Sequence, residues 1–130
     1  MDIREWTIVY VRHRDLIARK LQTVDEKDDC VIFTFKDYEL VAYPMEQLSL
    51  PPHAGKTGGK TLITTHQTKA NVDALIKGWK SFAAVKDLTV IFVNLSTNEK
   101  WLIHPHTHAQ IADTNLEGGI RSIADGVTYM

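Results

Sequence analysis

The sequence predicts a single α+β domain over residues 1–130, in which a mixed central sheet of about five strands is flanked by helices. Two observations carry this prediction. Stretches rich in β-branched and aromatic residues alternate with stretches whose apolar residues recur at helical spacing. The resulting order is helix, three strands, helix, two strands, helix, and a chain of this length can bury roughly two-thirds of its unfolded surface in one core.

The first helix is predicted over residues 3–23. Asp2, followed three residues later by Glu5, forms a capping-box pattern at its start. The competing interpretation is a short strand over residues 7–11, which are rich in β-branched side chains. The residues that helical spacing places on one inner face are Trp6, Val9, Tyr10, His13, Leu16, Ile17, Leu21 and Val24.

An acidic link at residues 25–29 precedes two short strands, at residues 30–35 and 38–43, which a two-residue Lys-Asp turn joins as a hairpin. Cys30 begins the first of these strands. A single cysteine in an apolar run is typical of a buried side chain in a reducing compartment, and the alternative role of nucleophile finds no local partner. With no signal-like N-terminus and no apolar run of membrane length, we expect a cytoplasmic protein and no membrane partner.

Residues 45–60 are predicted to form an exposed, mobile loop, because two prolines and three glycines interrupt any regular pattern. Within it, residues 54–61 (AGKTGGKT) fit a loose phosphate-binding-loop pattern with alanine in the first position. Such a loop needs a buried strand before it and a helix after it. Here Pro51 and Pro52 precede the pattern and a β-branched stretch follows it, so we expect a lysine-bearing loop rather than a nucleotide site.

A strand at residues 61–65 is followed by a helix from Thr68, where the apolar period changes. Gly78 weakens this helix and is expected to allow close packing against the sheet. The apolar stripe of the helix consists of Val72, Leu75, Ile76, Trp79, Phe82 and Ala83.

The strand at residues 88–95 is apolar on both faces, with Phe92 on one side and Ile91 on the other, which indicates a strand covered by a layer on each side. The polar residues 96–99 return the chain into a second strand at residues 101–104, as in a hairpin. A last helix is indicated near the C-terminus, with Gly126 as its terminator. Its apolar residues at helical spacing are Leu116, Ile120, Ile123 and Val127.

Fifteen basic side chains against sixteen acidic ones leave a net charge of −1, so any binding of nucleic acid must use a local basic patch. Such a patch is predicted where the exposed side of the first helix, with Lys20 beside it, meets the lysines of the loop. The alternative is an ordinary solvated helix face whose charge Asp15 and its acidic neighbours cancel. The predicted nucleic-acid contacts are Arg12, Arg14, Arg19, Lys56 and Lys60.

The cluster His104, His106 and His108 is a candidate metal site. In an extended chain these alternate side chains point the same way, about 6.5–7 Å apart, and Asp113 joins them if a helical turn follows. Zinc favours imidazole ligands, and zinc, manganese or magnesium with an open position supplies a hydrolytic water. The alternative is a set of hydrogen-bonded surface histidines at a strand exit, which Pro105 between two of them favours.

The order helix, three strands, helix, strand over residues 3–95 resembles the core of the restriction-endonuclease-like superfamily of PD-(D/E)xK nucleases. In that family an acidic residue on the second strand and an acid-x-Lys motif on the third hold magnesium and activate water. Asp37 and Glu39 lie at the start of the second predicted strand, but the third, residues 61–66, has no acid-x-Lys motif. The resemblance implies a member that has lost its nuclease chemistry or moved its residues. The residues beside the missing motif are His66, Gln67 and Lys69.

Three functional hypotheses follow from the sequence. The first is a binding module for nucleic acid or a protein partner, without a complete catalytic set. The second is a metal-dependent hydrolase or nuclease that uses the histidine cluster. The third is a homodimer whose interface uses Ile8 and Val11, which lie off the predicted inner face of the first helix and need a second layer or a partner subunit to cover them. Whether the protein is an enzyme stays open.

Overall fold

The structure, a computed structural model, describes residues 1–56, 59–111 and 115–130. In these residues the chain is α+β, with five helices and one six-stranded mixed sheet, so the predicted fold class is confirmed with one strand more than expected. The elements in chain order are α1 (Ile3–Arg14), β1 (Leu21–Glu26), β2 (Val31–Phe35), β3 (Glu39–Met45), β4 (Lys60–His66), α2 (Lys69–Lys77), α3 (Trp79–Ala83), β5 (Leu88–Val93), β6 (Lys100–Ile103), α4 (Pro105–Ile111) and α5 (Leu116–Ala124).

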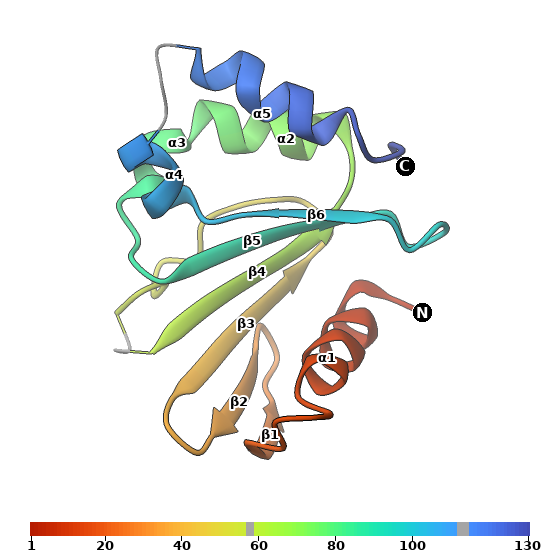
Figure 1. Cartoon of the computed structure of the whole chain (residues 1–130), viewed down its shortest axis with the longest axis vertical. Coiled ribbons are helices and arrows are strands. Elements are labelled where there is room, and N and C mark those ends of the chain that lie inside the picture. Colours follow the sequence, from red (N-terminus) through yellow and green to blue (C-terminus); the bar gives the residue numbers. More distant parts are fainter. Residues whose placement is uncertain (57–58, 112–114) are drawn as a thin grey trace.

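The six strands lie side by side in the order in which they occur along the chain (Figure 1). β3, β4 and β5 are parallel, and the other neighbouring pairs are antiparallel. A parallel pair needs a crossover connection, which residues 46–59 supply before β4 and the helices α2 and α3 supply before β5. Consequently β3, β4 and β5 begin at the same end of the sheet, marked by Glu39, Lys60 and Leu88, which we call the proximal end.

One face of the sheet is covered by α2, α3 and α5, and we call it the three-helix face (Figure 1). Val72 and Leu75 of α2 and Ile120 of α5 are fully buried against the β5 side chains Val90 and Phe92. Each such side chain contributes about 1.5–3 kcal/mol by leaving water. This face therefore holds the larger core of the protein.

The opposite face carries α1 alone among the described helices, and we call it the α1 face (Figure 1). Asp2 caps α1, since its carboxylate accepts from the backbone N–H of Glu5 at 2.8 Å, as the sequence predicts. The hydroxyls of Thr7 and Thr64 hydrogen-bond at 2.6 Å and join the helix to β4. Twelve residues span only about 18 Å, and α1 lies mainly against β3 and β4, so the neighbouring part of this face stays open.

The predicted length of the first helix is wrong, because α1 ends at Arg14 instead of continuing to residue 23. The carboxylate of Asp15 accepts from the backbone N–H groups of Lys20 and Leu21, each at 2.9 Å, and this closes a turn after the helix. Arg19 adopts φ 52° within that turn. The chain then pairs with β2 as β1, which supplies the sixth strand and adds one strand to the predicted element order.

The predicted inner face of this helix is also wrong in part. The buried residues are Ile3, Trp6, Thr7 and Val11, whereas Ile17 is 97 % exposed. Val11 is only 6 % exposed and lies in the core, so it is not available to a partner subunit. The competing strand at residues 7–11 is wrong because the whole segment is helical.

The remaining predicted elements lie within a few residues of their expected positions. Gly78 ends α2 and begins α3, so it breaks the predicted helix into two. The loop before β4 is less exposed than expected, because Leu48 is buried in the three-helix core. β5 is covered on both faces, as predicted, although it lies next to the edge strand β6. No helix in the described ranges has the length and apolar character needed to cross a membrane.

Candidate nucleic-acid interface

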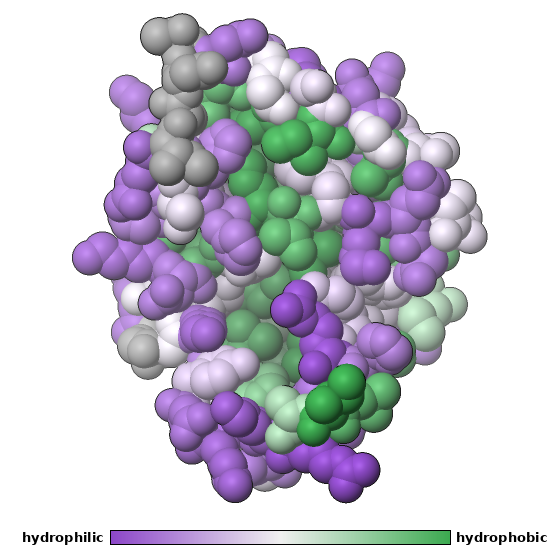
Figure 2. Space-filling model, viewed as in Figure 1, coloured by the Kyte–Doolittle hydropathy of each residue, from purple (hydrophilic) through white to green (hydrophobic). Residues whose placement is uncertain are grey.

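The open part of the α1 face forms a groove of about 690 Å³ at the proximal end of the sheet. α1 and the β2–β3 turn border it on one side, and the end of β6 and the start of α4 border it on the other. In the space-filling view, apolar surface lies in a hollow between hydrophilic margins (Figure 2). We call this feature the basic groove, after the cationic side chains in its lining, which are Arg14, Lys20, Lys60 and Lys86.

The topology brings these cations together from distant parts of the sequence. Arg14 is the last residue of α1, and Lys20 directly precedes β1. Lys60 begins β4, and Lys86 lies two residues before β5. Because the parallel strands β4 and β5 begin at the proximal end, and because β1 begins there too, all four side chains reach the same groove.

Little negative charge opposes these cations. Within the described part of the chain, no ion pair joins Arg14, Lys60 or Lys86 to a carboxylate, whereas Arg121 outside the groove is paired twice. Of the two carboxylates in the lining, that of Asp15 already accepts two backbone N–H groups. The groove therefore presents cations that are available to an anionic ligand.

Two tyrosine rings stand among the cations. Tyr10 stacks on Trp6 with centroids 5.0 Å apart, and Lys100 of β6 lies 5.9 Å from its centroid. Tyr38 stacks on Phe35 with centroids 4.7 Å apart. Cations also lie beside each tyrosine from the groove lining: Arg14 donates to the Tyr10 hydroxyl at 2.8 Å, and the Lys60 nitrogen lies 4.3 Å from the Tyr38 centroid. The groove thus combines aromatic and cationic groups on the side that α1 and the β2–β3 turn border.

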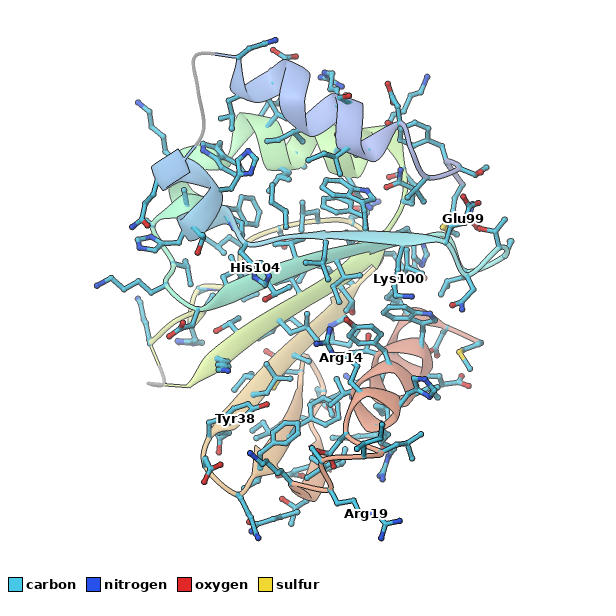
Figure 3. The ribbon with its side chains drawn as sticks, in the orientation of Figure 1. Arg14, Arg19, Tyr38, Glu99, Lys100 and His104 are labelled. Carbon is cyan, nitrogen blue, oxygen red and sulfur yellow. The ribbon has the colours of Figure 1, made fainter. Side chains whose placement is uncertain are left out.

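The structure separates the predicted nucleic-acid contacts into two sets. Arg14 and Lys60 lie in the basic groove. Arg12 and Arg19 line a different hollow beside β1, and Figure 3 shows Arg19 at the end of the molecule away from the groove. Lys56 is exposed in the loop before β4, outside the groove lining.

The groove also contains residues that sequence reasoning did not select. The sequence does not single out Lys86, because it stands alone in the link before β5, and helical spacing places Tyr10 on the core face of a longer helix. The alternation of side chains along β6 places Lys100 and Leu102 on the α1 face, and His104 directly after the strand continues it. This period of two is a usable signal in the sequence. Figure 3 shows Lys100 and His104 along that strand.

The extended geometry expected for the histidine cluster is wrong, because Pro105 begins α4 and puts His106 and His108 on a helix. His104 Nδ1 is 2.9 Å from the Thr89 hydroxyl, and His106 Nδ1 is 2.8 Å from the carbonyl oxygen of Ala83. The His108 ring meets Trp79 edge-on, 5.6 Å between centroids. Asp113 lies outside the described residues.

No group of three or more His, Cys, Asp or Glu side chains in the described residues is placed to hold a metal ion. The predicted divalent-metal site thus finds no support from these side chains. Cys30 is buried, and burial first and then the adjacent Asp29 raise the pKa of its thiol, so it is a protonated core side chain at neutral pH.

The other candidate motifs have structural roles or an unsuitable setting. Lys60 and Thr61 of the phosphate-binding-loop pattern lie on a strand instead of a helix N-terminus, and residues 57–58 of the pattern lie outside the described residues. Gln67, beside the missing acid-x-Lys motif, is fully buried. Its amide nitrogen donates to the carbonyl oxygens of Ala124 and Val127, and its oxygen accepts from Trp101 Nε1 at 2.7 Å.

Comparison with models of protein families, with curated protein sequences and with solved structures finds no match for this chain. A functional argument for it therefore depends on the geometry of the basic groove.

Proposed function

We propose that this protein is a nucleic-acid-binding module and that the basic groove is its phosphate-contact surface. One observation carries the proposal: cations from four separate segments, Arg14, Lys20, Lys60 and Lys86, line one groove. Neutralising several phosphates with lysine and arginine supplies most of the affinity of sequence-independent nucleic-acid binding. A net charge of −1 makes a local concentration of cations necessary for this function, and the groove supplies it.

The charge arrangement distinguishes the groove from an ordinary solvated surface. On the outer surface of the three-helix face, Arg121 is held by Asp73 at 2.8 Å and by Glu117 at 3.1 Å. In the groove, Lys20 has a single exposed carboxylate partner, Asp37, at 3.8 Å. At this exposed site such a pair is worth little, so phosphate can replace the carboxylate.

The proposal includes a cytoplasmic location, which the free, buried thiol of Cys30 supports.

The test is a titration of fluorescein-labelled DNA and RNA oligonucleotides by fluorescence anisotropy at several salt concentrations. The triple variant Arg14→Gln/Lys60→Gln/Lys86→Gln removes three cations of the groove. We expect at least about tenfold weaker binding, and a salt dependence, d log K/d log [salt], that becomes shallower by about 2.

The matched control is Arg12→Gln/Arg19→Gln/Lys56→Gln, which removes the same charge from residues outside the groove lining. It should keep nearly the affinity of the unmodified protein. Absence of salt-dependent binding by the unmodified protein, or an equal loss in both triple variants, contradicts the proposal. Preferential binding of poly-glutamate over oligonucleotides would assign the groove to an acidic protein partner instead.

A further inference from the structure

The basic groove has features that phosphate contact alone does not use. Its floor includes the apolar side chains of Leu62, Ile91 and Leu102, and its margins include Tyr10 and Tyr38. We propose that the groove binds single-stranded nucleic acid and that Tyr38 is a stacking platform for a base. This inference rests on the proposed nucleic-acid function and names the kind of strand.

The apolar floor of the groove favours a single strand. A double helix presents phosphates on its outer surface and keeps its bases paired inside, so it does not place bases on such a floor. A single strand exposes both its phosphates and the faces of its bases. Leu102 is 38 % exposed on the floor, an apolar surface that an unpaired base can cover. The cavity of about 690 Å³ holds a few nucleotides at most.

Tyr38 is built as a rigid platform. Its ring stacks on Phe35 at an interplanar angle of 12°, and Phe35 is buried in the core beneath α1. The stacked partner occupies one face of the tyrosine ring and fixes its orientation. The side chain remains 38 % exposed at the β2–β3 turn, where it lines the groove. Because the ring is already held in place, a base can stack on it without the entropic cost of ordering the tyrosine side chain.

Lys60 connects the platform to the phosphate contacts. Its nitrogen lies 4.3 Å from the Tyr38 centroid, and the described residues offer it no carboxylate partner. When a base stacks on the Tyr38 ring, the Lys60 side chain leaves the ring and contacts the phosphate of the same nucleotide. Tyr10 repeats the arrangement on α1, because it stacks on Trp6 and has Arg14 and Lys100 beside it.

None of these proposed contacts involves the hydrogen-bonding edge of a base. Stacking on an aromatic ring accepts any base, and the cations contact only the backbone, so we expect weak sequence preference. Each of the two ring-and-cation units offers a ring for one base and a cation for its phosphate.

The experiment compares three labelled ligands at the same salt concentration: a 12-nucleotide oligo-dT, a 12-base-pair duplex and an abasic 12-mer that keeps the phosphates. Fluorescence anisotropy is the readout. We expect the unmodified protein to bind oligo-dT at least about tenfold more tightly than either the duplex or the abasic strand, because only oligo-dT offers free base faces.

Tyr38→Leu removes the ring and keeps an apolar side chain. It should weaken oligo-dT binding by about 5- to 100-fold and leave both abasic-strand binding and the salt dependence unchanged. Tyr38→Phe retains the ring and should bind like the unmodified protein. The matched control is Tyr129→Leu, since Tyr129 also has a lysine near its ring, Lys69 at 5.6 Å, but lies outside the groove lining.

The outcomes separate this inference from the proposed function. If the triple groove variant loses binding while the duplex binds as tightly as oligo-dT and Tyr38→Leu has no effect, the single-strand inference is overturned and the nucleic-acid function stands. If thymidine monophosphate binds as tightly as oligo-dT, the groove is a nucleotide site and the strand inference is overturned. If no oligonucleotide binds, both proposals fail.

Discussion

The two faces of the sheet are covered to different extents, and the difference produces both the core and the candidate site. On the three-helix face, α2, α3 and α5 exclude water, so Val90 and Phe92 are fully buried. On the α1 face, a single twelve-residue helix lies mainly against β3 and β4 and leaves Leu102 of β6 exposed. The covered face supplies most of the apolar burial, and the open part is available to a ligand.

The polar groups of the two faces also differ in whether they have partners. Gln67 and Asn71, buried on the three-helix side, use their side-chain amides in several hydrogen bonds. No buried side-chain nitrogen or oxygen among the described residues lacks a hydrogen-bond partner. In the open groove, by contrast, Lys60 and Lys86 remain without a carboxylate partner in the described part of the chain. The fold satisfies polar groups where water is excluded and leaves charge available where water enters.

The proposed difference between the two faces is contradicted if the loss of an apolar side chain lowers the free energy of unfolding equally on both. Phe92→Ala removes a fully buried ring that stacks on Trp101 at 4.4 Å, and we expect the free energy of unfolding to fall by about 3–5 kcal/mol. Leu102→Ala, on the neighbouring strand but on the open face, should change it by about 0.5 kcal/mol or less. Urea unfolding followed by circular dichroism measures both. Equal losses would mean that Leu102 is part of a packed core.

A smaller effect tests how α1 is attached to its face. The Thr7 hydroxyl donates to the carbonyl oxygen of Ile3 at 2.7 Å and accepts from the Thr64 hydroxyl at 2.6 Å. Thr7→Val removes this acceptor and leaves the fully buried Thr64 hydroxyl without a partner. We expect about 1–2 kcal/mol of destabilisation, and Thr7→Ser should retain most of the stability. Hydrogen exchange should become faster for the amides of α1 than for those of α2. Uniformly faster exchange in both helices would show that α1 and the three-helix face unfold as one unit.

The smallest expected effect is a pH dependence of the free energy of unfolding, which arises at Glu99 in the β5–β6 hairpin. Hydrogen bonds from Thr128 and then Thr97 lower the pKa of the Glu99 carboxyl below its ordinary value of 4.5, although the group is exposed. A lowered folded-state pKa stabilises the fold above the unfolded-state pKa, and that stabilisation is lost as the pH falls through the folded-state value. Below about pH 4.5, Glu99→Gln should therefore lose less stability than the unmodified protein. Parallel pH profiles of urea midpoints would contradict this role.

Local signals predicted several elements correctly. Asp2 was recognised as a cap because its side chain serves a backbone N–H three residues away. The β2–β3 hairpin and the two-sided burial of β5 follow from short apolar runs whose period is set by strand geometry. The end of α1 was not predictable in this way, since residues 21–26 become a strand only by pairing with β2.

The candidate site shows more clearly which features follow from local sequence and which depend on the tertiary structure. The sequence by itself determined an α+β chain with near-balanced charge, two clear hairpins and basic side chains on the exposed side of its first helix. Only the tertiary structure decided that Arg14, Lys60 and Lys86 share one groove with two tyrosine rings while Arg12 and Arg19 do not. The physical reason is that sequence periodicity records which face of one element a side chain occupies. The meeting of cations from separate elements depends on where parallel strands begin and on how short α1 is.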